Sequence, residues 1–196
     1  MSKFTFKLVL LGDASVGKTS LVLRFINNAF SEKYISTIGA DFLIKDLVLL
    51  GAPVRLMIWD IAGQTNWTHL RARYMQGADG CILVFDTSRE TDIEWYVSRW
   101  LMEINDFIGE TPLIIVGNKI DLKPEIDLKE AANYIKKLNH LYMETSAKTG
   151  DRVESMFQRI SADIIKSKAE YVKRLKGVKE ADISKIFNKI REKHEN

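Results

Sequence analysis

The sequence predicts an α/β protein with a six-stranded, mostly parallel sheet, one antiparallel edge strand and about five flanking helices. Short apolar runs typical of buried strands alternate with segments whose apolar residues recur at helical spacing. Two of the apolar runs are separated only by Gly51-Ala52-Pro53, a length suited to a hairpin. The length of 196 residues suits one domain with a sizeable core.

The first apolar run is followed by a helix, because Leu21, Val22, Phe25 and Ile26 fall at helical spacing. Further strands and helices then follow in turn, and this order is typical of βαβ units. The expected strands cover 6–11, 42–50, 54–60, 80–86, 112–118 and 141–145, and the later helices cover 91–108, 127–138 and 151–168.

The turn after the first strand reads GDASVGKTS, residues 12–20. Gly12, Gly17, Lys18 and Thr19 fit the pattern G-x-x-x-x-G-K-[ST] between a strand and a helix. Backbone N–H groups of such a loop converge on an anion, and the helix N-terminus adds positive charge. Lys18 would then reach the β- and γ-phosphates of a nucleotide, and the Thr19 hydroxyl would ligate Mg²⁺. An ordinary glycine-rich turn is the alternative, and the strand–loop–helix context argues against it.

Three polar motifs follow later strands: DIAGQ (60–64), NKID (118–121) and SAK (146–148). Each is a common turn by itself. The carboxyl ends of parallel strands meet at one edge of a sheet, so together the three motifs predict one ligand site beside the phosphate loop.

The chemistry of these motifs fits a guanine nucleotide. The Asp121 carboxylate can accept hydrogen bonds from N1–H and the 2-amino group of guanine, and adenine offers neither donor. Asp60 can hold Mg²⁺ through water. Gly63 can bring its N–H close to the γ-phosphate, and Gln64 can orient a water molecule.

At about residues 5–166 the chain resembles the Ras-like small GTPases, and the Rab branch most closely, because STIGADF (36–42) and WDIAGQ (59–64) join the motifs above. The resemblance implies a P-loop NTPase fold, a G domain over 1–168, and a switch between GTP and GDP forms in regulation of the membrane-traffic kind. Hydrolysis would be slow without an activating protein. Mg²⁺ would be the cofactor, with Thr19, Thr37 and Asp60 as ligands, and Gln64 and Lys18 would be catalytic.

The same resemblance implies the residues that contact the nucleotide. Thr37 would give a hydroxyl to Mg²⁺ and an N–H to the γ-phosphate, and Phe30 would pack across the guanine edge. Asn118 and Ala147 would bond the base, with the Lys119 stem over its face. The full expected set is Asp13, Ala14, Ser15, Val16, Gly17, Lys18, Thr19, Ser20, Phe30, Thr37, Gly63, Asn118, Lys119, Asp121, Ser146, Ala147 and Lys148.

The sequence departs from the Rab pattern in four places. Ala14 stands where Ras has Gly, and its methyl group would crowd an incoming arginine finger. Thr65-Asn66 replaces the usual Glu-Arg, and YMQGA (74–78) replaces YYRGA. The chain ends in REKHEN without a cysteine for prenylation.

A GTP-bound scaffold with negligible hydrolysis is the alternative function. Gln64 and Thr37 argue against it, and Ala14 leaves it open. A small-molecule kinase is a weaker option because it explains neither NKID nor SAK.

Effectors, an exchange factor and a GTPase-activating protein are expected to bind through residues 37–75. Phe42, Trp59 and Tyr74 fall where Rabs carry an aromatic trio. If they are exposed, Phe42, Trp59 and Trp67 are candidate partner anchors. For Trp59, core packing is an equal alternative. Other side chains have simpler expected roles: Trp95 and Trp100 pack, Cys81 lies in a core strand, and His69, His140 and His194 bind no metal.

The tail over 169–196 carries eight Lys or Arg and five Asp or Glu, which accounts for the whole net charge of +3. The rest of the chain is neutral, so no nucleic-acid partner is expected. Ile183, Ile186, Phe187 and Ile190 form one helical face in the tail. The tail is a solvated extension, a segment that docks on the domain or a second copy, or a weak membrane-surface helix. We expect a monomer that is cytoplasmic or peripheral to a membrane surface.

Overall fold

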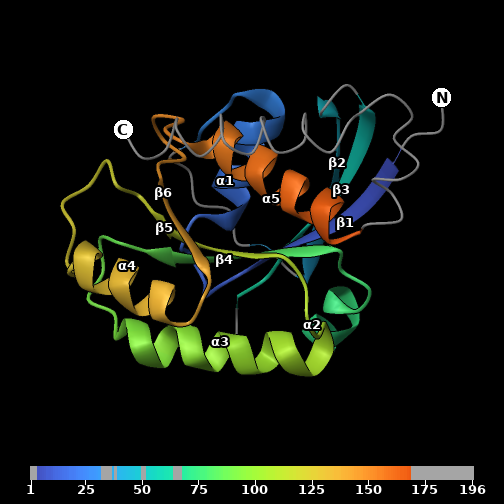
Figure 1. The fold of residues 1–196 in the computed structure, drawn as a ribbon. Helices are drawn as coiled ribbons and strands as arrows, with labels where there is room; N and C mark the ends of the chain where they lie inside the picture. Colours follow the sequence, from blue (N-terminus) through green and yellow to red (C-terminus); the bar gives the residue numbers. More distant parts are fainter. Residues whose placement is uncertain (1–3, 32–36, 38, 50–51, 64–67, 169–196) are drawn as a thin grey trace.

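The computed structural model describes residues 4–31, 37, 39–49, 52–63 and 68–168 (Figure 1). A six-stranded sheet has the order β2-β3-β1-β4-β5-β6, and its neighbouring strands run parallel except for the β2–β3 hairpin at the edge. The strands are β1 Phe4–Leu11, β2 Ala40–Leu49, β3 Ala52–Ile61, β4 Gly80–Asp86, β5 Leu113–Asn118 and β6 Leu141–Thr145. The predicted fold class is thus confirmed.

Within the described residues, five helices cover the two faces of this sheet. In Figure 1, α1 and α5 lie on one face, whereas α2, α3 and α4 lie on the other. The helices are α1 Lys18–Asn27, α2 Thr68–Met75, α3 Ile93–Phe107, α4 Leu128–Lys137 and α5 Val153–Ser167. Asp92 caps α3 by accepting from Trp95 N at 2.9 Å, and Asp127 caps α4 in the same way.

The alternation of side chains along β1 divides the core in two. Phe6, Leu8 and Leu10 point into the layer under α1 and α5, whereas Val9 and Leu11 point into the layer under α3 and α4. Every one of these five side chains is at most 1% exposed. A strand buried on both faces must be apolar throughout, which explains the continuous run.

Two tryptophans of α3 differ in burial. Trp100 is 1% exposed, as the packing prediction requires, and Cys81 in β4 is fully buried. The packing prediction is wrong for Trp95, which is 61% exposed. The buried residues of α3 are Tyr96, Val97, Trp100 and Ile104, so Trp95 begins the outward face and lies beneath the Arg99 guanidinium instead, 4.9 Å from it.

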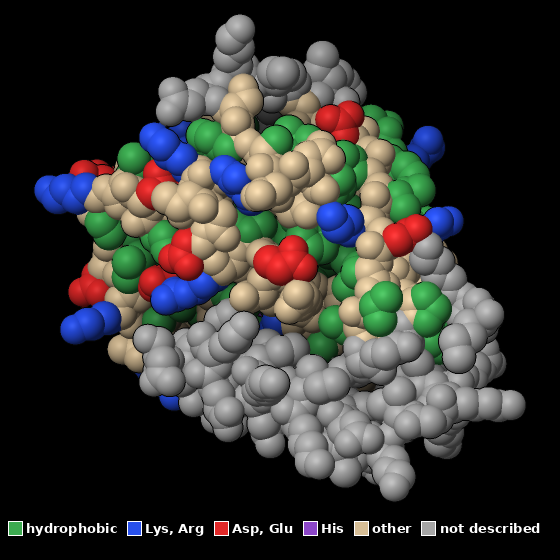
Figure 2. Space-filling view, turned by 90° about the horizontal axis from the view of Figure 1, so that it is seen from above, with side chains coloured by type: hydrophobic (Ala, Val, Ile, Leu, Met, Phe, Trp, Pro, Cys, Tyr) green, Lys and Arg blue, Asp and Glu red, His purple; other side chains and the backbone are tan. Residues whose placement is uncertain are grey.

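The described part of the surface seen in Figure 2 carries basic and acidic side chains interspersed with apolar ones. On α5, for example, Arg159 pairs with Asp163 at 2.9 Å. Mixed charge of this kind gives no broad positive field on that part of the face. The predicted tail, residues 169–196, lies outside the described residues.

Candidate functional site

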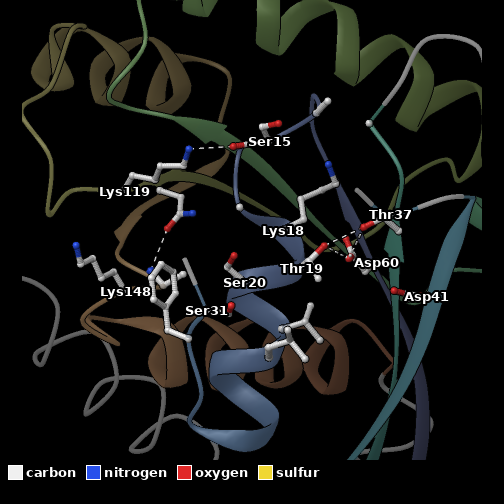
Figure 3. Close-up of a pocket in the computed structure, with 18 of the residues that line it drawn as sticks. Ser15, Lys18, Thr19, Ser20, Ser31, Thr37, Asp41, Asp60, Lys119 and Lys148 are labelled. Carbon is white, nitrogen blue, oxygen red and sulfur yellow. Dashed lines mark hydrogen bonds between the residues drawn. The ribbon is translucent and has the colours of Figure 1, made fainter. Parts of the chain in front are cut away.

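A cavity of about 1000 Å³ opens at the carboxyl ends of the parallel strands, between the start of α1 and the loops after β3, β5 and β6 (Figure 3). It brings together residues that lie more than 130 positions apart in the sequence. Of the predicted set, it is lined by Ala14, Ser15, Gly17, Lys18, Thr19, Ser20, Phe30, Thr37, Asp60, Gly63, Asn118, Lys119, Asp121, Ala147 and Lys148.

Three predicted contact residues are not part of the cavity lining: Asp13, Val16 and Ser146. Val16 is buried at 3% exposure, and Ser146 is fully buried behind Asp121. Gln64 lies outside the described residues, so its role stays a prediction.

The loop between β1 and α1 depends on glycine at two positions. A Cβ on Gly12 would lie 2.1 Å from the Val84 carbonyl oxygen, and one on Gly17 would lie 2.3 Å from Asn118 Nδ2. Both glycines have positive φ, +133° and +98°. Gly17 is also the N-cap of α1 and offers no side-chain cap. The first N–H groups of α1 are therefore left to face an anion in the cavity.

Lys18 is held at the centre of this loop. Its ammonium donates to the carbonyl oxygens of Gly12 and Asp13, both at 2.8 Å. Burial lowers its pKa to about 8, although Asp60 and Asp13 act in the opposite direction. A cation this poorly solvated gains strongly from a polyanionic ligand, and such a ligand would raise the pKa again.

Three oxygen-bearing side chains meet on the other side of Lys18 (Figure 3). Thr19 Oγ1 lies 3.0 Å from Thr37 Oγ1 and donates a very short hydrogen bond to Asp60 Oδ2, and Thr37 Oγ1 lies 3.4 Å from the same oxygen. Asp60 Oδ1 is buried without a hydrogen-bond partner among the described residues. Burial is also the main reason why the pKa of Asp60 is raised.

This cluster fits Mg²⁺, which prefers a few hard oxygen ligands from the protein and completes its shell with water and substrate phosphates. An unpaired carboxylate oxygen in a buried site is best satisfied by a cation. The described residues contain no group of three or more His, Cys, Asp or Glu that could hold a metal. Two hydroxyls and one carboxylate would leave coordination positions for water and phosphate oxygens.

Gly63 lies directly against the phosphate loop. A Cβ there would come within 2.3 Å of the Gly12 carbonyl oxygen and 2.6 Å of the Ala14 nitrogen. Only glycine allows the chain after β3 to approach the loop so closely. The DIAG segment is thus in contact with the loop that would hold the phosphates.

The opposite end of the cavity is built from the NKID and SAK motifs. Asn118, fully buried, donates from Nδ2 to the Val16 carbonyl at 2.9 Å and accepts from Ala147 N at 3.3 Å, so it ties three loops together. Ser146 Oγ donates to Asp121 Oδ1 at 2.5 Å. The other Asp121 oxygen is not used in this bond, and the carboxylate lies at the cavity wall. It is placed to accept from a flat heterocycle with two adjacent donors.

Comparison with known proteins agrees with this geometry. The model of the Ras family matches residues 7–166. The chain belongs to the Ras family. A relative, the Ras-related protein Rab-1C of Dictyostelium discoideum, is 40% identical over 164 residues, which cover 82% of this chain and 81% of that protein. As a Ras-family member with a Rab relative, the protein is a small GTPase.

Asp86 and Arg89 were not predicted as residues of this Ras-family site, and both are linked to the predicted Lys119. Lys119 Nζ donates to the Ser15 carbonyl at 2.9 Å and pairs with Asp86 at 2.6 Å. Arg89 pairs with the same carboxylate at 3.3 Å and lines the cavity. Asp86 is the last residue of β4, and Arg89 lies just after this strand. The sequence has no nucleotide motif there, so the only available signal was that β4 ends at the same edge of the sheet.

Arg24 is a second supporting residue. From α1 it donates to the carbonyl oxygens of Ala147 at 2.9 Å and Lys148 at 2.5 Å. It therefore fastens the SAK loop to the helix that begins at the phosphate loop. In the sequence, Arg24 reads as an ordinary polar residue on a helix.

The aromatic trio of the Ras-family chain is assembled as the resemblance implies. Phe42 and Tyr74 lie 5.0 and 5.6 Å from Trp59, and the Lys7 ammonium lies 5.0 Å from the Trp59 ring. Phe42 is 46% exposed, whereas Trp59 is partly buried and packs against the core under α3. The packing prediction therefore holds for part of the Trp59 side chain, and its role as a partner anchor stays a prediction. Trp67 lies outside the described residues.

Proposed function

We propose that this protein is a Rab-type switch that binds GTP or GDP with Mg²⁺, hydrolyses GTP, and presents residues 37–75 to partners in one nucleotide state. The observation that carries the proposal is the convergence on one cavity of an uncapped helix N-terminus, a buried lysine, the Thr19–Thr37–Asp60 oxygens and the Asp121 carboxylate. These groups match the phosphates, the metal and the base of a single guanine nucleotide.

Each group has a separate task in this proposal. Lys18 and the N–H groups at the start of α1 neutralise the β- and γ-phosphates, and that charge is largest in the transition state of phosphoryl transfer. Mg²⁺, held by Thr19, Thr37 and Asp60, would neutralise the remaining phosphate charge. Thr37 and Gly63 line the phosphate side of the cavity, so loss of the γ-phosphate would release both.

The proposal is tested by the nucleotide that co-purifies with the protein and by single-turnover hydrolysis of bound GTP. We expect bound GDP or GTP, slow intrinsic conversion of GTP to GDP, and acceleration by a Rab-directed activating protein. Retention of GTP over days with and without activators would instead support the scaffold function, in which Ala14 blocks the arginine finger.

We expect Gln64→Leu to slow hydrolysis at least about tenfold while GTP affinity changes little. An amide that orients water acts in the transition state and contributes little to ground-state binding. Single-turnover hydrolysis and the GTP dissociation rate, measured on the same preparation, separate the two effects. Gln158→Leu in α5, at a residue that does not line the cavity, is the matched control. A Gln64→Leu protein as fast as the parent would remove the water-positioning role.

The partner surface proposed here centres on Phe42, Trp59 and Tyr74. Its mixture of exposed aromatic area and the Lys7 cation is typical of interface anchors. The surface adjoins Thr37 and Gly63, so a partner could detect the nucleotide state there. Regulation of membrane traffic is the process proposed, since the relative is a Rab protein.

None of the described helices is both long and apolar enough to cross a membrane. We propose that any contact with a membrane surface is made by residues 169–196. Binding should be weak and salt-sensitive, because four apolar residues and a small excess of basic ones contribute little. We therefore expect slight sedimentation with anionic vesicles, none with neutral vesicles, and none at all once residues 169–196 are removed. Salt-resistant sedimentation of the shortened protein would contradict this prediction.

A further inference from the structure

We propose that Asp13 is a positioning residue of the phosphate loop, held in place by Arg99 and Trp100 of α3, and that it makes no direct contact with the nucleotide. This inference rests on the proposed function, because it concerns how tightly the loop binds phosphate. It replaces the expectation that Asp13 touches the ligand.

The polar groups of Asp13 are directed at the protein. Its backbone N–H donates to the Tyr96 hydroxyl at 3.0 Å, and its carbonyl oxygen accepts from Lys18 at 2.8 Å. Its Oδ1 accepts from the Trp100 indole N–H at 3.1 Å and, in a very short contact, from the Arg99 guanidinium. Asp13 does not line the cavity. These hydrogen bonds make it a link between the phosphate loop and α3.

The partners of Asp13 form a rigid platform. Trp100 and Tyr96 are 1% and 3% exposed, and the Tyr96 hydroxyl also donates to the Val84 carbonyl at 2.6 Å. The Arg99 guanidinium lies 5.2 Å from the Trp100 ring and 4.9 Å from the Trp95 ring, so its position is restricted by two aromatic surfaces. Because side chains locked by packing hold a site more accurately than free ones, this platform can fix the loop.

The same platform also holds α2, the helix that follows the DIAGQ motif. Arg71 is 3% exposed, lies 4.7 Å from the Trp100 ring, and pairs with Glu103 of α3 at 2.9 and 3.1 Å. Trp100 therefore contacts the phosphate loop through its N–H and α2 through its ring. One buried side chain of α3 is therefore in contact with both segments.

The proposal predicts a selective loss of affinity. The loop N–H groups that cradle phosphate follow Asp13 directly, whereas the base is held at the opposite end of the cavity. Releasing Asp13 should therefore weaken binding of the β-phosphate and leave the base contacts intact. An ordinary half-exposed ion pair would instead contribute only a little to overall stability and nothing to ligand preference.

The test measures dissociation constants of GDP and GMP for the full chain and its variants. For Arg99→Ala and for Asp13→Ala, we expect GDP to bind about tenfold more weakly, the loss typical of one charge-assisted hydrogen bond, while GMP binding changes less than about twofold. The double variant should lose no more than Asp13→Ala alone, because Arg99 has no Asp13 carboxylate left to bind once Asp13 is alanine. Arg99→Lys should recover part of the loss.

Trp100→Phe removes the indole N–H but keeps a ring beneath Arg71, so it should produce the same selective loss. Arg55→Ala, which breaks the exposed Arg55–Asp46 pair on the β2–β3 hairpin, is the matched control and should leave the GDP-to-GMP ratio unchanged. Thermal unfolding identifies any variant that fails to fold, and Asp13→Asn then serves as the milder replacement.

The inference is overturned if the GDP-to-GMP ratio of the folded variants equals that of the parent, whether both affinities stay the same or both fall by the same factor. Failure of the proposed function gives a different result, since the parent protein would then bind neither GDP nor GMP.

Discussion

Replacing Asp121 with asparagine is expected to weaken GDP binding by about four orders of magnitude and to create a preference for XDP. The Asp121 carboxylate can accept from N1–H and from the 2-amino group of guanine. Asparagine presents an N–H₂ to the second group, and two donors then face one another. Xanthine carries a carbonyl at that position, so the new amide has a hydrogen-bond acceptor to meet.

The geometry around Asp121 explains why the effect should be large. One carboxylate oxygen accepts from Ser146 Oγ at 2.5 Å, and the residue lies in the wall of the cavity. Ser146 is fully buried, and its Oγ in turn accepts from Thr149 N at 3.0 Å. The Ser146 hydroxyl, held by Thr149 N, thus fixes the orientation of the Asp121 carboxylate. A ligand without matching donors would leave the carboxylate without hydrogen bonds from the ligand.

Competition binding with GDP, XDP and ADP measures the predicted change. Ser146→Ala is the matched variant: it removes the hydroxyl that orients Asp121 and should weaken GDP binding without any new preference for XDP. If Asp121→Asn kept the preference of the parent for GDP, Asp121 would not contact the base.

How far the sequence predicts the fold depends on whether each element carries its own pattern. The predicted strand 80–86 has the same bounds as β4, where every residue is buried and burial on both faces demands an apolar run. The predicted strand 141–145 also has the bounds of β6, although β6 is only partly buried. None of the helices expected from the sequence covers α2. Its eight residues, THLRARYM, show no apolar face, and Arg71 in their midst is buried by pairing with Glu103. The burial of Arg71 depends on Glu103 of α3, a contact that the local sequence does not show.

In the candidate site too, residues in a local motif could be predicted, whereas residues that act through distant partners could not. Lys18, Asp60 and Asp121 were predictable because each belongs to a contiguous motif at a strand end, and the topology of a parallel sheet brings strand ends together. Arg24 and Asp13 act through partners that are 123 and 87 positions away in the sequence, Ala147 and Trp100. No local pattern marks such pairs, so their role becomes visible only when α1 and α3 are packed.

Thr19→Asn should reduce GTP affinity about ten- to a hundredfold more than GDP affinity, the range expected for loss of one oxygen ligand at a charged site. Thr19 Oγ1 lies at the centre of the Thr37–Asp60 cluster, 3.0 Å from Thr37 Oγ1. Thr37 belongs to the γ-phosphate side of the cavity, so disruption of the cluster penalises the nucleotide that carries a γ-phosphate. The larger asparagine side chain also adds a donor beside Asp60, where a cation would otherwise be held.

The measurement is competition between GTP and GDP at saturating and at chelated Mg²⁺. The parent should lose affinity for both nucleotides on chelation, and more for GTP, whereas the Thr19→Asn protein should respond little because its cluster is already broken. Thr19→Ser keeps the hydroxyl and should behave like the parent, which separates the chemistry of the oxygen from the packing of the Thr19 methyl. Equal losses of GTP and GDP in Thr19→Asn, with the chelator response intact, would show that Thr19 supports the helix start and takes no part in holding the metal.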